Sequence, residues 1–286
     1  MTLTQLSYIV AVNKYRHFAT AAQHIYITQP TLSMQIQKLE DELGVLIFDR
    51  SKSPVVPTAI GDGNLTGSFR VGIIPTIAPY LVPLFLKPFT EAHPNVKLIF
   101  EEALTSDVIK GLNEDHFDVG IIATSTNQHI YEHELFSEPF LGYLSPGHEF
   151  SKKEKLCIDD LYSQNLWLLN EGHCFRDQTI KLCKQTNDKR SNSNISFESG
   201  NLETLKRLVE KDFGITLMPY LAMQDHDTRC ANGVIKEFME PVPTRKIRLV
   251  YSREFLKKNI VTAFVDTIKN SIPEELKTVK KEMLVE

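Results

Sequence analysis

The stretch FATAAQHIYITQPTLSMQIQKLEDELG, residues 18–44, decides the fold of the first part of the chain. Its alanine-rich start, Phe18 to Ile25, predicts a short helix whose small side chains let another helix approach closely. After a tight connection, a longer helix is predicted with Thr28 as its N-cap, Pro30 in its first turn and Gly44 as its C-cap. Two helices joined in this way predict a helix–turn–helix.

The two faces of the longer helix differ in chemistry. Its apolar positions Leu32, Ile36, Leu39 and Leu43 form one stripe, which is typical of a face that packs on a core. The opposite face is short, polar or uncharged, so it could enter a major groove and read base edges, or it could belong to a helix that only packs. The side chains on this candidate DNA-reading face are Gln29, Thr31, Ser33, Met34 and Gln37.

The flanking segments complete a small domain. A first helix is predicted over residues 4–12, and the positions at helical spacing are Leu6, Ile9, Val10 and Asn13. Val45–Ile47 and Val55–Thr58 are predicted to pair as a hairpin. Arg50 and Lys52 lie in its turn, where they would reach phosphate or a minor groove.

Residues 1–60 resemble the winged helix–turn–helix of LysR-type transcriptional regulators. The likeness rests on the alanine pair, the QPTLS start of the recognition helix, its KLEDELG end and the LIFDRS entry to the wing. It implies an all-α domain with a wing, and these DNA-facing residues: Gln29, Pro30, Thr31, Ser33 and Arg50. Position 34, often basic in the family, is methionine here.

Residues 61–68, GDGNLTGS, are predicted to form a short flexible joint. LysR-type proteins usually carry a long linker helix here that pairs two subunits, whereas this sequence passes almost directly to a predicted strand at Phe69. Because the sequence on both sides keeps the family pattern, we interpret the linker helix as missing from this sequence rather than replaced.

From Phe69 onward, predicted strands and helices alternate, which indicates an α/β fold with parallel pairing. The predicted elements are strands over 69–74, 96–102, 117–123, 167–170, 195–199, 214–219 and 245–251, and helices over 78–92, 105–116, 202–211 and 260–272. A crossover at 138–146 divides the regulatory domain, 69–286, into lobe I (69–137 and 244–286) and lobe II (138–243), with a cleft between them. Residues 274–286 are predicted to be a fraying helix end.

The second informative stretch is EGHCFRDQTIKLC, residues 171–183. Cys174 lies beside His173 and Arg176 at the start of a predicted helix, so its pKa is expected to be lowered. If residues 175–183 are helical, the Cα atoms of Cys174 and Cys183 lie about 13.5 Å apart, whereas a disulfide needs roughly 4.4–6.8 Å. A bond between them would therefore require the helix to unwind. Alternatively, both cysteines are ordinary small hydrophobes in a core.

Residues 69–270 resemble the two-lobed, periplasmic-binding-protein-like (type 2) regulatory domain of LysR-type proteins, and in particular its peroxide-sensing members. The shared stretches are IPTIAPYLVP, EDHFDVGIIA, LLNEGHCFRDQ, SGNLETLKRLV and GITLMP. The resemblance implies that Cys174 is the peroxidatic cysteine and Cys183 the resolving one, joined through a sulfenic acid in a reversible disulfide.

Five further residues are candidates for this site. His173 would polarise peroxide or support the thiolate, unless it is an ordinary core histidine. Thr76, at a helix start facing the cleft, would hold peroxide by its hydroxyl or act as an N-cap. Arg176 and Asp177 would cap the helix or pair with each other, and Arg176 would also lower the Cys174 pKa. Thr124, just past a strand end, is a weaker candidate.

Composition and the N-terminal sequence favour a cytoplasmic protein. The net charge of −4 excludes a bulk basic nucleic-acid binder, and neither a signal peptide nor a membrane-spanning run is evident. Cys157 and Cys230 are expected to be structural or incidental. No metal or cofactor is expected, with hydrogen peroxide as the signal. The resemblance implies promoter DNA, RNA polymerase and a thiol reductant as partners, in a homodimer or homotetramer.

Three alternatives remain at this stage. A regulator that binds a small organic effector between the lobes, with cysteines that do not switch, is the principal one. A thiol enzyme such as a peroxidase is disfavoured by the DNA-binding head and by the lack of an enzyme motif. A periplasmic solute receptor is disfavoured by the missing signal peptide.

Overall fold

The computed structural model describes residues 2–43, 46–50, 53–57, 65–126, 130–162, 164, 166–183, 199–224, 232–252, 257–277 and 281–286. These residues form two compact units. One comprises Met1–Gly67 with Asn95–Lys97, and the other Ser68–Pro94 with Leu98–Glu286. Among the described residues, no helix is both long enough and apolar enough to cross a lipid bilayer.

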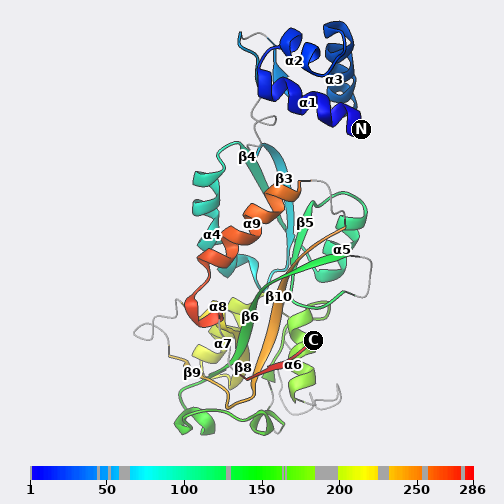
Figure 1. The fold of residues 1–286 in the computed structure, drawn as a ribbon. Coiled ribbons are helices and arrows are strands. Elements are labelled where there is room, and N and C mark those ends of the chain that lie inside the picture. Colours follow the sequence, from blue (N-terminus) through cyan, green and yellow to red (C-terminus); the bar gives the residue numbers. More distant parts are fainter. Residues whose placement is uncertain are drawn as a thin grey trace. The chain divides into compact units, whose positions relative to one another are not determined.

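The first unit is a winged helix–turn–helix, as predicted. It contains helices α1 (Leu3–Tyr15), α2 (Phe18–His24) and α3 (Gln29–Leu43), and the antiparallel strands β1 (Phe48–Asp49) and β2 (Val56–Pro57) (Figure 1). The first hairpin strand, predicted at Val45–Ile47, lies instead at Phe48–Asp49. Val45, Lys52 and Thr58 lie outside the described residues. The small side chains Ala21 and Ala22 are buried, which lets the helices pack closely.

The recognition helix α3 has the predicted limits. Thr28 caps it, because the Thr31 N–H donates to Thr28 Oγ1 at 3.3 Å. Leu32, Ile36 and Leu39 are fully buried, but Leu43 is 47% exposed, so the apolar stripe ends one turn early. Gly44, the predicted C-cap, lies outside the described residues.

The large apolar residues of α1 do not form its buried face. Leu6 is 38% and Val10 66% exposed, whereas Ala11 and Val12 are buried. Gln5 is also buried, and its side chain closes a capping box with Thr2 at the start of the helix. The helix therefore turns a different side to the core from the one that its large apolar residues suggest.

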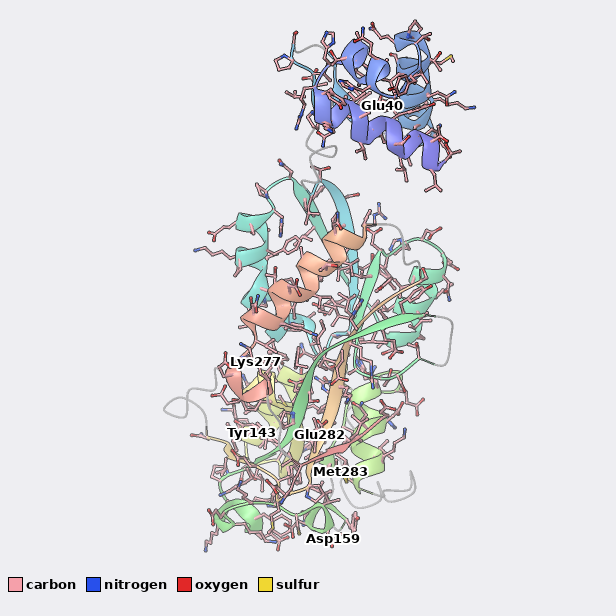
Figure 2. The ribbon with its side chains drawn as sticks, in the orientation of Figure 1. Glu40, Tyr143, Asp159, Lys277, Glu282 and Met283 are labelled. Carbon is pink, nitrogen blue, oxygen red and sulfur yellow. The ribbon has the colours of Figure 1, made fainter. Side chains whose placement is uncertain are left out.

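Glu40 fastens the wing to α3. This buried carboxylate accepts hydrogen bonds from the Ile47 N–H at 2.8 Å and the Phe48 N–H at 3.1 Å (Figure 2). Its second oxygen pairs with Arg50 Nη2 at 2.7 Å. Because the wing strands are very short, this one side chain supplies much of the polar contact that holds the entry to the wing.

The second unit is built on one mixed sheet. Its described strands follow the order β4-β3-β5-β10-β6-β8-β7, with β11 beside β10 and β9 beside β6. These strands are β3 (Gly67–Ile73), β4 (Val96–Glu102), β5 (Val119–Ile122), β6 (Tyr131–Leu144), β7 (Leu166–Trp167), β8 (Ile215–Pro219), β9 (Val234–Lys236), β10 (Val242–Tyr251) and β11 (Glu282–Leu284). The long strands β6 and β10 pair antiparallel and run through both halves of the sheet (Figure 1).

Helices cover this sheet and form two cores. They are α4 (Ala78–Ala92), α5 (Thr105–Asn113), α6 (Cys174–Cys183), α7 (Leu202–Glu210), α8 (Tyr220–Met223), α9 (Lys258–Ser271) and α10 (Glu274–Lys277), with 3-10 turns at Glu149–Lys152 and Ile158–Leu161. In the β3–β5 half, Phe264 of α9 packs edge-on against Phe69, Phe85 and Phe89. In the other half, Phe140 stacks on Phe175 at 5.1 Å.

Two expectations for this unit were wrong. Only part of the sheet is parallel: β3 pairs parallel with β5, but β10 pairs antiparallel with both β5 and β6. Residues 282–284, expected to continue a fraying helix, instead form β11, which pairs parallel with the start of β10. The segment 195–198 of the predicted strand 195–199 and residues 61–64 of the joint lie outside the described residues.

Candidate functional site

The candidate DNA-reading face of α3 lies on the surface. Met34 is 60% exposed. Gln29, Pro30 and Gln37 are also exposed, whereas Thr31 and Ser33 are half-buried. Arg50 is held within the unit, because it pairs with Glu40, donates to Ser33 Oγ at 3.2 Å and lies over the Phe18 ring.

The candidate redox site lies at the start of α6. Gly172, with φ of +92°, turns the chain into this helix, and Cys174 is its first residue. Cys183 ends the helix and is 1% exposed in the core of lobe II. Cys157, Cys174 and Cys183 are all free thiols, and Cys230 lies outside the described residues. The two candidate switch cysteines are therefore held at opposite ends of one intact helix.

The expected lowering of the Cys174 pKa was wrong for this arrangement. Burial raises the pKa of the Cys174 thiol, and this outweighs the groups that favour the thiolate. The largest of those is the Arg245 guanidinium, followed by the Thr105 hydroxyl at the start of α5. Thr105 Oγ1 is buried and has no hydrogen-bond partner within the described residues. The positive charge that most lowers the Cys174 pKa thus belongs to Arg245 of β10, not to Arg176.

The immediate neighbours of Cys174 also differ from expectation. His173 is 7% exposed, and burial lowers its pKa, so it favours the neutral imidazole rather than an imidazolium. Arg176 is buried and approaches Glu171 at 3.8 Å rather than pairing with Asp177. Asp177 is exposed in the first turn of α6, where its charge suits the helix dipole but raises the Cys174 pKa.

Arg245 and Glu138 organise the site, and the sequence reasoning missed both. They face each other across β10 and β6, are fully buried, and pair at 2.8–2.9 Å. Arg245 Nη1 also donates to Thr76 Oγ1 at 3.1 Å, and Nη2 to the Thr76 carbonyl at 3.2 Å. The guanidinium lies 5.0 Å from the centre of the Phe175 ring, next to Cys174. It therefore joins Thr76 of lobe I to the start of α6 in lobe II.

Thr76 is buried but does not cap a helix. The N-cap of α4 is Ile77, without a side-chain cap, and the Thr76 hydroxyl accepts from Arg245 instead. Its own hydrogen is therefore free to be donated elsewhere. Thr124 is half-buried just after β5, beside Ala123, whose carbonyl accepts from Gln178 of α6.

The sequence did carry a signal for the missed pair. Alternate residues of a strand point to the same side of the sheet. Arg245 alternates with Ile247 and Leu249 in one strand, and Glu138 alternates with Phe136 and Phe140 in the other. Both charged residues are fully buried with these neighbours. A charged residue on the apolar side of a strand indicates a buried partner of opposite charge.

Comparisons with known proteins give the family. Residues 3–62 match the family model described as "Bacterial regulatory helix-turn-helix protein, lysR family", and residues 62–273 match "LysR substrate binding domain". A hydrogen peroxide-inducible genes activator from Haemophilus influenzae is 33% identical over 276 residues, 88% of this chain and 90% of that protein.

Solved structures agree. A full-length OxyR variant from Pseudomonas aeruginosa has a TM-score of 0.65 at 32% identity, covering 95% of this chain and 99% of that one. A hydrogen peroxide-bound OxyR variant from Corynebacterium glutamicum has a TM-score of 0.66 at 27% identity, covering 98% and 97%. A winged helix–turn–helix joined to this regulatory domain defines a LysR-type transcriptional regulator, and the chain belongs to the LysR family. Within that family it resembles the OxyR proteins.

Proposed function

We propose that this regulator senses hydrogen peroxide at Cys174 and stores the signal as a reversible Cys174–Cys183 disulfide. The observation that carries the proposal is the position of the two thiols: one lies beside Arg245, Thr105 and His173, and the other lies buried at the far end of the same helix. The names of the relatives, peroxide-inducible activators and OxyR, point the same way.

The chemistry runs in two steps. The Cys174 thiolate attacks one peroxide oxygen, the O–O bond breaks, and the departing hydroxide takes a proton to leave as water, with Cys174 as a sulfenic acid. The Cys183 sulfur then attacks the Cys174 sulfur. The S–S bond forms, the S–O bond breaks, and the hydroxide leaves as a second water with the Cys183 proton. A cellular dithiol then reduces the disulfide by exchange, which returns both cysteines to thiols and leaves the reductant as a disulfide.

The residues around Cys174 suit the first step. Thr76 has a hydroxyl hydrogen to donate, because its oxygen already accepts from Arg245. The Thr105 hydroxyl lies against the thiol, and neutral His173 can donate or accept. Such donors stabilise the negative charge that develops on the departing peroxide oxygen. The Thr105 hydroxyl also favours the thiolate, but burial keeps the Cys174 pKa raised, so we assign these groups chiefly to transition-state stabilisation.

The second step requires α6 to open. The helix places the two Cα atoms about 13.5 Å apart, well beyond disulfide reach. Burial also raises the pKa of Cys183 to about 12, so this thiol is a weak nucleophile until it leaves the core. Disulfide formation is therefore a conformational event, which is what a regulator needs to alter its contacts with promoter DNA.

The DNA-binding part of the proposal uses the exposed face of α3. Gln29, Thr31, Ser33, Met34 and Gln37 would face base edges, and Pro30 would pack against the DNA backbone. Arg50 would have to exchange its contacts with Glu40 and Ser33 for phosphate, or reach it while held by them. A homodimer or homotetramer would set half-site spacing, and RNA polymerase would read the switched state.

Thiol mapping by mass spectrometry after brief, low-dose hydrogen peroxide tests the proposal. We expect a rapid Cys174–Cys183 disulfide, with Cys157 and Cys230 still free, and no such bond in Cys183→Ser. If all four thiols stay reduced, the redox mechanism fails, and a small organic effector bound between the lobes becomes the function to test. A peroxide response lost in Cys157→Ser would mean that the wrong thiols are paired.

A further inference from the structure

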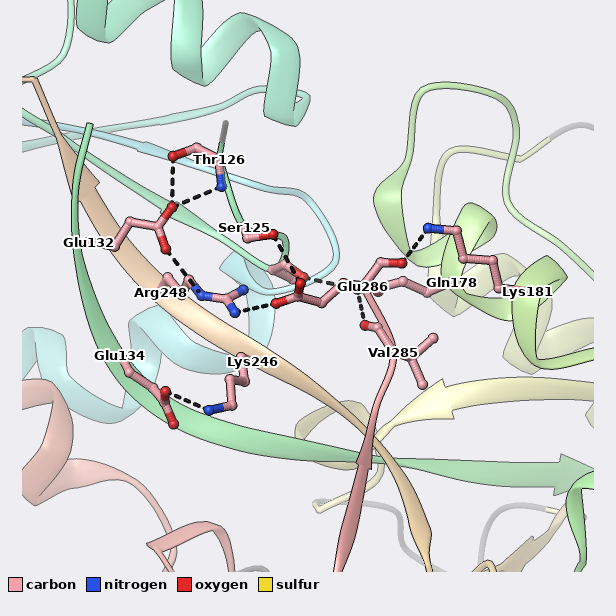
Figure 3. A network of polar contacts seen from close by, with 11 residues as sticks. Ser125, Thr126, Glu132, Glu134, Gln178, Lys181, Lys246, Arg248, Val285 and Glu286 are labelled. Atoms are coloured by element: carbon pink, nitrogen blue, oxygen red, sulfur yellow. Dashed lines mark hydrogen bonds and ion pairs between the residues drawn. The ribbon is translucent and has the colours of Figure 1, made fainter. Parts of the chain in front are cut away.

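The Gln178 side chain ties α6 to two segments that are remote from it in sequence. Gln178 lies near the middle of the helix, between the two cysteines, and is 1% exposed. Its Nε2 atom donates to the carbonyl oxygen of Ala123 at 2.9 Å and to that of Val285 at 3.0 Å (Figure 3). Ala123 follows β5, and Val285 follows β11.

A second tie lies one turn further along the same face of α6. Lys181 donates to the main-chain oxygen of Glu286. The Glu286 carboxylate is in turn bound by Arg248 of β10 and by Ser125 Oγ at 3.0 Å (Figure 3). The segment 281–286 is therefore held between the helix and the strand that passes through both lobes.

This segment also shares a core with the resolving cysteine. Val285 is 5% exposed and belongs to the apolar cluster that contains Phe175, Leu182 and Cys183. Its N–H donates to the Thr244 carbonyl at 2.9 Å, which continues the β10–β11 pairing. Movement of Cys183 would therefore disturb the same cluster in which Val285 is buried.

Two buried polar atoms of the docked helix are unpaired. Among the described residues, the buried Gln178 Oε1 and Arg176 Nε have no hydrogen-bond partner. A buried polar atom left unpaired lowers the stability of the arrangement that contains it. The two hydrogen bonds from Gln178 Nε2 offset that cost and attach the middle of α6 to Ala123 and Val285.

We propose that Gln178 is a positioning residue that latches α6, and that the latch must release, together with segment 281–286, before Cys183 reaches Cys174. The inference rests on the proposed peroxide switch and adds a rate-setting element to it. Bringing Cys183 to Cys174 unwinds the helical turns that position the Gln178 side chain, so both of its hydrogen bonds are lost before the disulfide forms. Gln178 therefore governs the rate of disulfide formation and leaves the rate of sulfenic acid formation unchanged.

Gln178→Met in the full chain tests the latch, because methionine keeps the volume of the side chain but cannot donate. Stopped-flow mixing with hydrogen peroxide, followed by quenching and trapping of sulfenic acid and disulfide, measures the two steps separately. We expect sulfenic acid to form at the wild-type rate and the disulfide to form about tenfold faster, since two hydrogen bonds hold the closed helix.

Thr179→Val is the matched control. Thr179 is equally buried on the same helix and donates only to the Phe175 carbonyl within α6, at 2.8 Å. Its disulfide rate should stay at the wild-type value. The latch is overturned if Gln178→Met forms the disulfide at the wild-type rate, or if sulfenic acid formation accelerates together with disulfide formation. A wild-type chain that forms no Cys174–Cys183 disulfide would instead refute the proposed function.

Hydrogen exchange on the wild-type chain tests the same idea without a substitution. The Val285 amide is protected by its bond to Thr244 in the reduced form. After oxidation to the disulfide, we expect residues 281–286 to lose at least tenfold of their protection, because release of Gln178 frees this segment. Unchanged protection of the Val285 amide in the fully oxidised protein would overturn the latch.

Discussion

Arg245 combines a structural and a chemical role in one side chain. Fully buried, it pairs with Glu138, binds both oxygens of Thr76 and lies against Phe175. It is also the main group that lowers the pKa of Cys174 against the effect of burial. A substitution that removes the guanidinium alone therefore lowers both the stability of the domain and the reactivity of Cys174. Removing the Glu138 charge as well separates the two effects, because no unpaired buried charge is then left.

Arg245→Met should destabilise the regulatory domain by about 3–5 kcal/mol, because it leaves the Glu138 carboxylate buried without its cation. The double variant Arg245→Met, Glu138→Gln removes both charges and should recover most of that stability. Both variants should oxidise Cys174 about tenfold more slowly, because loss of the guanidinium raises the Cys174 pKa further and leaves less thiolate. Urea unfolding and peroxide kinetics measure the two effects. A double variant with wild-type kinetics would show that Arg245 does not tune the thiol.

The raised pKa of Cys174 predicts a pH dependence. Burial holds the pKa above its ordinary value of 9.0, so the reactive thiolate is a minor species at neutral pH. The rate of sulfenic acid formation should therefore rise about tenfold per pH unit between pH of about 6 and 8, because the thiolate fraction rises in that proportion. A rate that levels off below neutral pH would mean that the thiol is already ionised there.

Whole elements show where sequence reasoning works and where it fails. Helix Ala78–Ala92 and strand Val96–Glu102 were predicted to the residue, because apolar periodicity and turn residues mark both ends. The burial of Gln5 was not foreseen, since glutamine is ordinarily an exposed residue.

In the candidate site too, features set by local sequence could be predicted, whereas features set by remote contacts could not. That α6 links the two cysteines could be predicted, because local sequence decides it. The charge that faces Cys174 could not, because Arg245 reaches the site through pairing of β10 with β6, which depends on contacts far apart in the chain. Strand β11 was missed for the same reason: only its partner β10 makes Glu282–Leu284 a strand (Figure 2).

The wing hairpin depends on one residue of α3. Glu40→Ala should destabilise the first unit by about 2–4 kcal/mol, because it leaves the buried Ile47 and Phe48 N–H groups without their acceptor. Lys38→Ala, at an exposed position on the same helix, should change stability by less than about 0.5 kcal/mol. Thermal unfolding of the full chain, with hydrogen exchange at residues 46–57, compares the two. Equal effects would argue against Glu40 as the anchor of the wing.

At the scale of the regulatory domain, the two lobes are joined by specific contacts as well as by the crossing strands. Tyr80 of α4 donates to Glu203 of α7 at 3.0 Å. A Cβ atom on Gly172 would approach Leu104 to 2.9 Å, so the turn before α6 lies tightly against lobe I. These contacts favour a switch that rearranges α6 locally over one that opens the lobes.

Tyr80→Phe should cost about 1 kcal/mol of unfolding free energy, the usual value of one hydrogen bond. Burial and the Glu203 carboxylate raise the Tyr80 pKa, so its contribution is fully present below the ordinary tyrosine pKa of 10.0 and is lost as pH rises above it. Urea unfolding of Tyr80→Phe, Glu203→Ala and the double variant measures the coupling. Strictly additive costs would show that the two side chains do not interact.

The burial of Cys183 would set a time scale for the proposed switch. A thiol that is 1% exposed cannot be reached until its helix opens, so sulfenic acid formation at Cys174 would precede disulfide formation by the time that α6 takes to open. Under the proposed mechanism, a short pulse of oxidant that is cleared within that time would leave only a sulfenic acid, which cellular thiols would reduce. A sustained exposure would outlast the closed helix and yield the disulfide. The stability of α6 would then set the shortest duration of oxidative stress to which transcription responds.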